Sequence, residues 1–417
     1  MALKRVVVTG LGALTPLGKT VETYWQGLAE GVSGCDFIKQ FDCSKFKTRF
    51  ACEVKNFEPT DYLDRKEARK IDRFTQFALI ASDEAVKDAG INKDNVDVDR
   101  VGVIFASGIG GLITFQEEVI NFASGDGTPR FNPFFIPKMI LDIAAGQISM
   151  RNGFRGPNYA VVSACASSTN AIIDAFDTIR LNKADIIVTG GSEAVISAAG
   201  VGGFNAMKAL SERNNDPATA SRPFDKDRDG FVMGEGAGVL ILESLEHALE
   251  RGAKIYCEIA GGGATADAHH ITAPHPEGLG AKNVMTVALA DAGLQPEDID
   301  YINVHGTSTP LGDIAETKAI LSVFGENAYK LNISSTKIMT GHCLGAAGAL
   351  EALACILAVT KNVVPPTINH FTDDPDLDPK LNFTFNKAQY RTVNAALSNT
   401  FGFGGHNASV IVKKYVA

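Results

Sequence analysis

Cys165 is the residue of this chain best placed to act as a nucleophile. It follows a β-branched run at residues 159–162 and stands among small side chains in SACASS, where a helix is predicted to begin. At a helix N-terminus the partial positive charge and the free backbone N–H groups favour a thiolate over a thiol. Those N–H groups are also suited to hold an oxyanion, and small neighbours let a carbonyl approach. We therefore expect covalent catalysis at Cys165, with a buried structural cysteine as the alternative.

Two histidines occupy similar positions. His305 follows a predicted strand at residues 301–304 and precedes GTSTP, and His342 precedes the small-residue run CLGAAG. A histidine at a helix start stays neutral, because the helix end opposes its protonation, and a neutral imidazole can donate a hydrogen bond to a developing oxyanion. One nucleophilic cysteine with two such donors indicates thioester chemistry. Each histidine alone is more often an ordinary hydrogen-bonded residue.

Two other motifs do not carry the chemistry that they first suggest. Gly10 and Gly12 follow a predicted strand, but a dinucleotide-binding turn needs a small residue where this chain has Thr15. The stretch TADAHHITAPHP holds three histidines, yet Pro274 and Pro276 break the helix that a paired metal site requires. We interpret the first motif as a tight turn and the second as a loop.

Short β-branched runs alternate with helical periods along the whole chain, as in an α/β protein with well-buried sheets. The predicted strands lie at residues 5–8, 101–105, 159–162, 186–188, 239–242, 255–259, 302–304 and 410–413.

A weak internal symmetry accompanies this alternation. FVMGEGAGVLILE and FGFGGHNASVIVK are both glycine-rich turns that enter a strand, and the segments around Cys165 and His342 both run from a small-residue loop into a helix. We predict two similar halves, residues 1–252 with the nucleophile and residues 253–417 with the two histidines. Chance recurrence of glycine-rich turns in an α/β protein is the alternative.

Composition excludes several classes of protein. The 39 Lys plus Arg against 48 Asp plus Glu give a net charge of −9, which is unfavourable for a general nucleic-acid binder. Seven cysteines form no CxxC pair, so we expect a reducing, cytoplasmic setting. The most apolar helix candidate, residues 345–359, carries Glu351 in its middle, and we expect no membrane span.

The motifs together resemble the β-ketoacyl-acyl-carrier-protein synthases of the thiolase superfamily, and specifically the type II condensing enzymes of bacterial fatty acid synthesis. The resemblance covers essentially the whole chain and rests on VVVTGLGALTPLG, SACASS, RPFDKDRDGFVMGEGAGVLILE, DAHHITAPHPEG, NVHGTSTPLGD, STKIMTGHCLGAAG and SNTFGFGGHN. It implies a thiolase-like, five-layered αβαβα fold built from two similar halves. It also implies a homodimer.

The resemblance implies the following catalytic roles. Cys165 takes an acyl chain from acyl carrier protein as a thioester. His305 and His342 then assist the decarboxylation of malonyl-acyl carrier protein and stabilise the enolate that attacks the acyl group. Lys337 and Glu351 match the charged pair that supports the histidines.

Further positions match binding residues of the family. The backbone N–H groups of Cys165 and Phe403 correspond to the oxyanion hole, and the Phe403 side chain to the gate for malonyl entry. Thr307 and Thr309 match contacts to the phosphopantetheine arm, and Ile109 matches the acyl pocket of type II enzymes. The family needs no cofactor for the reaction, although some relatives hold a monovalent cation. The corresponding residues are Asn303, Glu351, Ser398 and Asn399.

An acidic carrier protein calls for a local basic face on an acidic enzyme. In YLDRKEARKIDR, a continuous helix over residues 62–73 places four basic residues, Arg73 among them, on one side. A solvated charged face is the alternative. The carrier-docking positions of the family correspond to Lys66, Arg69, Lys70, Arg130 and Lys208.

These observations lead us to expect an elongating enzyme that condenses carrier-bound acyl chains with malonyl units and releases carbon dioxide. A ketosynthase of a polyketide pathway is the main alternative. A cysteine–histidine hydrolase fits the same nucleophile, but it predicts water as the second substrate.

Overall fold

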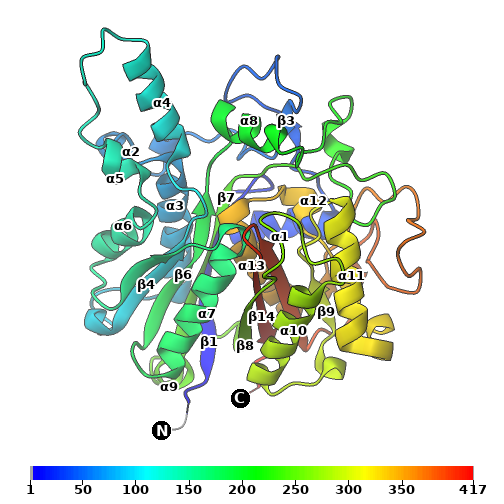
Figure 1. The fold of residues 1–417 in the computed structure, drawn as a ribbon. Helices are drawn as coiled ribbons and strands as arrows, with labels where there is room; N and C mark the ends of the chain where they lie inside the picture. The colour runs from blue at the N-terminus through cyan, green and yellow to red at the C-terminus, as the bar shows by residue number, and fades with distance from the viewer. Residues whose placement is uncertain (1–2, 417) are drawn as a thin grey trace.

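Ten strands form one mixed sheet in this computed structural model, which describes residues 3–416 (Figure 1). The strands lie in the order β10-β9-β13-β14-β8-β1-β7-β6-β4-β5. The N-terminal strands are β1 (Val6–Leu14), β4 (Val101–Ala106), β5 (Asn158–Val161), β6 (Ile186–Glu193) and β7 (Gly236–Ser244). The C-terminal strands are β8 (Cys257–Ala266), β9 (Tyr301–Asn303), β10 (Asn332–Ser334), β13 (Ala395–Gly402) and β14 (His406–Lys413).

The strand order is the same in the two parts of the sheet. From β1 outward the pairs β1–β7 and β7–β6 are antiparallel, and β6–β4 and β4–β5 are parallel. From β8 outward the pairs β8–β14 and β14–β13 are antiparallel, and β13–β9 and β9–β10 are parallel. A short antiparallel pairing of β1 with β8, in which Val6 faces Ile259, joins the two parts. The fold is therefore built from two similar halves. The boundary after residue 252 stays a prediction.

Helices and half-sheets form five layers, which Figure 1 shows from left to right. Helices α3 (Arg73–Ala89) and α6 (Ile143–Asn152) cover the N-terminal half-sheet, and α10 (Leu279–Ala292), with α11 (Pro310–Phe324) against it, covers the C-terminal one. Between the half-sheets lie α7 (Ser167–Arg180) and α13 (Ala347–Lys361), each in contact with strands of both. The expected αβαβα fold is confirmed.

Helix α13 is apolar on all sides because it lies in the central layer. The segment Leu344–Lys361 has a mean hydropathy of 1.6, enough by length and composition for a membrane span, but 89% of it is buried inside the protein. Its residues from Ala347 to Val359 pack between strands of both half-sheets. The segment is a core helix of the fold.

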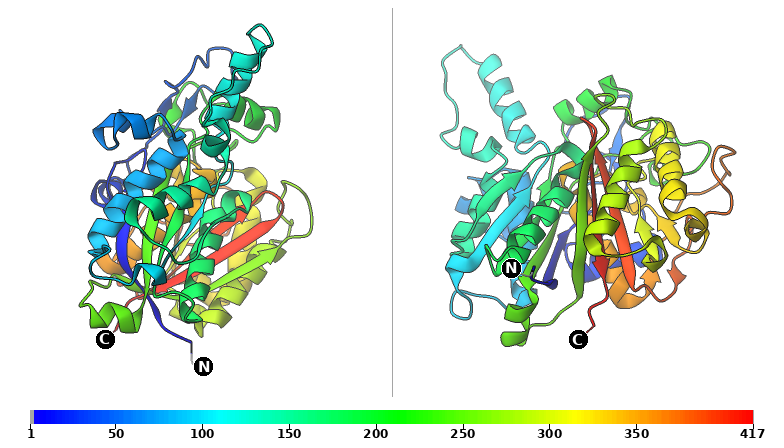
Figure 2. Two further views of the ribbon diagram at one scale, coloured as in Figure 1. Left: turned by 90° about the vertical axis from the view of Figure 1, so that its left-hand side faces the viewer. Right: turned by 60° about the horizontal axis from the view of Figure 1, so that its bottom comes forward.

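A helical hairpin of α4 (Leu112–Ala123) and α5 (Phe135–Met139) stands away from the layers (Figure 2). Large apolar side chains on it face solvent, among them Phe115 at 44% exposure and Ile136 at 55%. Such a surface is typical of a contact site for another protein chain.

The predicted continuous helix over residues 62–73 is wrong. Helix α2 covers only Arg65–Ala68, and α3 begins at Arg73. The reason is Asp72, whose carboxylate accepts a hydrogen bond from the Phe74 N–H and so caps a new helix. The Arg73 guanidinium turns inward and pairs with Glu235 at 2.7 Å, so it does not belong to the exposed basic face.

Candidate functional site

The nucleophile lies in a tight turn between β5 and α7. Cys165 is the middle residue of a single 3₁₀ turn, η3 (Ala164–Ala166), and Ala164 has a positive φ of 51°. The corresponding turn of the other half, η7 (Leu344–Ala346), begins at Leu344 with φ 45° and precedes α13. Positive φ at a residue with a side chain is strained and marks a backbone that its surroundings hold in place. Both halves therefore use the same turn at the site.

The two histidines converge on the nucleophile. His342 Nε2 lies 3.1 Å from Cys165 Sγ, although 177 residues separate the two in sequence. The rings of His305 and His342 are 5.4 Å apart and nearly perpendicular. The structure thus brings together the three residues for which the sequence indicates thioester chemistry.

Both imidazoles are neutral near pH 7. Burial lowers the pKa of His305 and of His342 well below the usual value of 6.5, and the charge of Lys337 lowers both further. The sequence argument attributed neutrality to helix ends, whereas burial is the main cause. A neutral ring can accept a proton at one nitrogen and donate a hydrogen bond from the other.

The thiol of Cys165 is protonated in the free protein. Burial raises its pKa from 9.0 to about 12, and Lys337 and the Phe403 N–H oppose this only in part. The expectation that the helix N-terminus favours the thiolate is therefore wrong for the free enzyme, because the desolvation of a buried charge outweighs the helix end. Attack by Cys165 needs a base, and His342 lies within hydrogen-bonding distance.

Two backbone N–H groups border the sulfur. The Phe403 N–H points at Cys165 Sγ. Gly402 packs so closely on the nucleophile turn that a Cβ there would lie 3.1 Å from the Cys165 nitrogen. This close approach brings the Phe403 N–H and the backbone of Cys165 next to each other.

Lys337 and Glu351 form an ion pair beside these residues. Lys337 begins α12 (Lys337–Thr340), Glu351 lies in α13, and both side chains are at most 3% exposed. The positive charge of Lys337 acts on Cys165 and on both imidazoles. The pair thus influences the site through its charge, without a hydrogen bond to either ring among residues 3–416.

A cavity of about 340 Å³ opens onto the nucleophile and the histidines. The hydroxyls of Thr307 and Thr309 lie 3.1 Å apart on its wall, and Phe403 and Lys208 also line it. Ile109 does not line this cavity; it lies in the turn before α4 and is 37% exposed. Of the predicted binding residues, all but Ile109 therefore face one space.

Four of the five predicted docking residues line a second, shallow depression. We call it the basic groove: it is lined by Lys66, Arg69, Lys70 and Arg130, together with aromatic side chains. Lys70 Nζ lies 5.7 Å from the centre of the Phe134 ring. Lys208 lies apart from the groove, at the cavity.

The predicted cation residues offer a partial fit. Asn303 on β9 and Ser398 on β13 are register partners, and the buried Asn303 Oδ1 and Ser398 Oγ have no hydrogen-bond partner in the described chain. Buried oxygens without partners are suited to bind a cation. Asn399 Oδ1 accepts a hydrogen bond from Ser409, however, and Glu351 pairs with Lys337. No cluster of three His, Cys, Asp or Glu residues able to hold a metal is present among residues 3–416.

Sequence reasoning missed Glu316, which lies in α11 below the histidines. Its buried carboxylate accepts hydrogen bonds from the N–H groups of His305 and Gly306, both at 2.9 Å. Burial raises the pKa of Glu316 from 4.5 to about 7. Glu316 is the seventh residue of α11, and an acidic residue at such a place gave no signal in the sequence.

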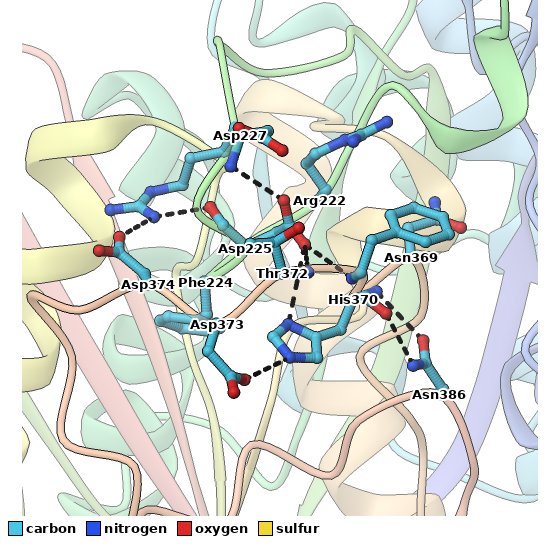
Figure 3. Close-up of polar contacts among 12 residues, drawn as sticks. Arg222, Phe224, Asp225, Asp227, Asn369, His370, Thr372, Asp373, Asp374 and Asn386 are labelled. Carbon is cyan, nitrogen blue, oxygen red and sulfur yellow. Dashed lines mark hydrogen bonds and ion pairs between the residues drawn. The ribbon is translucent and has the colours of Figure 1, made fainter.

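A second missed feature supports the segment that carries Thr307 and Thr309. Arg228 donates to the carbonyl of Pro310 at 3.1 Å and pairs with Asp313 at 3.4 Å. The loop of Arg228 is fixed in turn by Asp225, whose carboxylate accepts hydrogen bonds from the N–H groups of residues 371 and 372 (Figure 3). The high density of charged residues in RPFDKDRDG was the sequence signal that could have indicated this ion-pair network.

Comparisons with known proteins agree with this geometry. Residues 3–248 match the family described as "Beta-ketoacyl synthase, N-terminal domain", and residues 256–371 match "Beta-ketoacyl synthase, C-terminal domain". The chain is 50% identical over 412 residues to a 3-oxoacyl-[acyl-carrier-protein] synthase 2 of Synechocystis, covering 99% of this chain and 98% of the relative. It is likewise 50% identical over 415 residues to the Staphylococcus aureus protein of that name, covering 99% of both.

Solved structures give the same fold. A β-ketoacyl synthase from Burkholderia phymatum matches with a TM-score of 0.91 at 35% identity, over 99% of this chain and 100% of the other. A type II polyketide ketosynthase, solved in complex with its acyl carrier protein and bound to a hexaketide, matches with a TM-score of 0.92 at 34% identity, over 99% and 100%.

Proposed function

The chain belongs to the β-ketoacyl synthase family, and from this premise we propose the reaction it catalyses. It joins an acyl chain, carried as a thioester on Cys165, to malonyl-acyl carrier protein and so makes 3-oxoacyl-acyl carrier protein in fatty acid elongation. The contact of Cys165 Sγ with His342 Nε2 at 3.1 Å, beside the second neutral imidazole of His305, carries this proposal. Identity of 50% over nearly the whole length to two 3-oxoacyl-[acyl-carrier-protein] synthases 2 supports it.

Acylation begins with the protonated thiol. Cys165 Sγ attacks the thioester carbonyl of the acyl carrier while His342 Nε2 accepts its proton. The oxygen of the tetrahedral intermediate receives hydrogen bonds from the N–H groups of Cys165 and Phe403. The bond to the carrier sulfur then breaks, and the proton passes from His342 to the sulfur of the leaving carrier, which departs as a thiol.

Condensation needs the histidines as hydrogen-bond donors. When the malonyl carboxylate leaves as carbon dioxide, the electron pair of the broken C–C bond forms an enolate. The neutral rings of His305 and His342 donate hydrogen bonds to the enolate oxygen, because desolvation and Lys337 hold their pKa values low. For His342 this step uses the tautomer with the proton on Nε2, whereas acylation uses the tautomer with the proton on Nδ1. The enolate carbon attacks the acyl carbonyl, and Cys165 Sγ leaves as a thiolate that takes up a proton from solvent.

Substrate delivery uses the cavity and the basic groove. Thr307 and Thr309 bind the phosphopantetheine arm, Phe403 gates the malonyl group, and Ile109 lies on the side of the acyl chain. The basic groove and Lys208 attract the acidic carrier protein. A solved relative in complex with its acyl carrier protein supports this partner.

We also propose a homodimer and a cytoplasmic location. β5 is an edge strand with Tyr159 at 41% exposure, and an unpaired edge of this kind is a template for pairing with a second copy. The exposed apolar hairpin of α4 and α5 stands near the same end of the sheet (Figure 1). A monovalent cation bound through the oxygens of Asn303 and Ser398 is a structural part of this proposal and takes no step in the reaction.

A ketosynthase of a polyketide pathway is the second candidate, because one structural match at 34% identity is a ketosynthase of a type II polyketide system. Another, at 36% identity, is described as a ketosynthase/chain length factor. The 50% identity to fatty acid enzymes favours elongation. Product analysis with saturated acyl carriers and malonyl carrier distinguishes them, since a fatty acid enzyme releases its product after one condensation.

The experiment that tests the function is intact-protein mass spectrometry after mixing with acyl carriers of graded length. We expect one acyl group on the wild-type chain and none on Cys165→Ala. The Cys257→Ala variant, at a cysteine of β8 outside the apolar cluster of Cys165, still acquires it. Acyl-enzyme on Cys165→Ala would disprove the assignment. Thioester cleavage without a malonyl donor would instead indicate a hydrolase.

A further inference from the structure

Glu193, the last residue of β6, holds a buried carboxylate to which the reaction above gives no role. Its side chain has no solvent exposure. Oε2 accepts hydrogen bonds from the N–H groups of Gly108 at 2.7 Å and Gly345 at 3.0 Å. Burial raises the pKa of this carboxyl group, and hydroxyl and N–H donors, rather than a cation, are the main groups that oppose the rise.

The other oxygen binds one turn alone. Oε1 accepts hydrogen bonds from Ser107 Oγ at 2.9 Å and from the N–H groups of Ile109 and Gly110, both at 3.2 Å. Five donors from two distant segments thus meet one carboxylate. Only an ionised carboxyl group, which accepts at both oxygens and donates at neither, satisfies all of them.

Both segments lie against the nucleophile. A Cβ on Gly108 would be 2.8 Å from Glu193 Oε2 and 3.2 Å from the carbonyl oxygen of Ala164, the neighbour of Cys165. The same Cβ would also be 3.2 Å from the nitrogen of Gly345. Glu193 therefore holds the turn of residues 107–110 between the turn of Cys165 and the turn after His342.

The two segments that Glu193 binds lie next to apolar side chains that pack near Cys165. Leu344 directly precedes Gly345, and Leu112 begins α4 just after the clamped turn. Both pack in the apolar cluster that contains Cys165. An acyl chain that leaves the sulfur must run along such side chains, because the polar groups on the other side of the sulfur bind the thioester.

We propose that Glu193 is a positioning residue that fixes the turn of residues 107–110 and so sets the wall along which the acyl chain is bound. This inference rests on the proposed function. It concerns the acyl side of the site alone and leaves the decarboxylation groups unchanged.

Glu193→Gln affects the bonds made by the two carboxylate oxygens differently. Glutamine keeps one acceptor oxygen and gains an NH₂ donor. The oxygen keeps the bonds to Gly108 and Gly345, because both partners are N–H groups that can only donate, whereas the Ser107 hydroxyl can also accept from the NH₂ group. The NH₂ group therefore faces the N–H groups of Ile109 and Gly110. The N–H groups of Ile109 and Gly110 then face another hydrogen-bond donor instead of an acceptor, and the turn of residues 107–110 shifts away from residue 193.

The test compares acylation of Cys165 by a C14 and a C2 acyl carrier, with malonyl decarboxylation as a third measurement. In Glu193→Gln we expect the KM for the C14 carrier to rise about tenfold, as the loss of these hydrogen bonds implies. The C2 carrier, which does not reach the turn, and decarboxylation change less than about twofold, because the Gly345 bond persists. Equal effects on both carriers, or none, would overturn the proposal.

Two further variants keep the outcome decisive. Ser107→Ala removes one donor to Glu193 Oε1 and also the acceptor of the Gly110 N–H at 3.1 Å. If Glu193→Gln does not fold, we expect Ser107→Ala to raise the KM for the C14 carrier about threefold relative to that for the C2 carrier. Glu243→Gln is the control, because its buried carboxylate lies away from the site and accepts a hydrogen bond from Thr9 at 2.8 Å. This variant should change stability without changing the ratio of the KM values for the C14 and C2 carriers. If wild-type protein accepts no acyl group from any carrier, the proposed function itself has failed.

Discussion

His342→Ala should change the pH dependence of Cys165 alkylation. At pH 7.5 a thiol with a pKa of about 12 is ionised in about three molecules in a hundred thousand, against about three in a hundred for an exposed thiol with a pKa of 9.0. Direct reaction of the thiolate is thus about a thousandfold disfavoured. In the wild type, His342 at 3.1 Å removes the proton as the new bond to sulfur forms.

The two routes depend differently on pH. A neutral imidazole is a base at every pH well above its pKa, so the wild-type rate stays nearly constant from pH 7 to pH 9. Without His342 only the thiolate reacts, and the rate rises about tenfold for each pH unit, or about a hundredfold over the range. The measurement is the rate of carbamidomethylation of Cys165 by iodoacetamide, followed by peptide mass spectrometry.

His305→Ala is the matched control, because its ring lies next to His342 but makes no hydrogen bond to the sulfur within the part of the chain described. We expect it to keep the flat profile. Parallel profiles for wild type and His342→Ala would refute the argument that His342 acts as the base. A wild-type inflection near pH 7 would refute the raised pKa of the thiol.

Three further outcomes follow from charge and burial. The pKa of Glu316 is about 7 in the folded protein against 4.5 in the unfolded chain, so the free energy of unfolding falls by about 3 kcal/mol as the pH rises from below 4.5 to above 7. Urea denaturation at pH 5 and pH 8 measures this fall, which should be smaller in Glu316→Gln. Lys337→Met leaves the buried Glu351 charge unpaired and should destabilise the protein by about 4 kcal/mol in thermal unfolding, most of which Lys337→Met with Glu351→Gln regains. Reversing the charges of Lys66, Arg69 and Lys70, which line the basic groove, should raise the KM for carrier-bound substrate several-fold at low salt. The KM for a pantetheine-only substrate should not change.

The α/β class and the repeat were predictable because they depend on local patterns. Glycine-rich turns before β7 and β14 give the same signal in both halves, and these strands take equivalent places in the sheet. The layers themselves were expected only from the family resemblance. The pairing of β1 with β8 depends on contacts between residues about 250 positions apart, and no local pattern encodes it.

The site residues were predictable in type but not in state. Small neighbours identified Cys165 and His342 as reactive, yet the protonation of the thiol depends on burial by groups from both halves of the chain. In the basic segment, spacing alone predicted one helix. The cap at Asp72 ends that helix because its carboxylate binds both the Phe74 N–H and the Thr114 hydroxyl of a distant helix.

The position of β13 and β14 has a consequence for synthesis of the chain. These strands follow α13 in the chain by more than thirty residues, yet they lie inside the sheet beside β8 and β9, and they cover α13. The N-terminal half-sheet can close once β7 has emerged, whereas α13 exposes its apolar surface until residues 395–413 leave the ribosome. Aggregation during expression should therefore depend on the interval between the synthesis of α13 and that of residues 395–413, when a chaperone that shields α13 helps most.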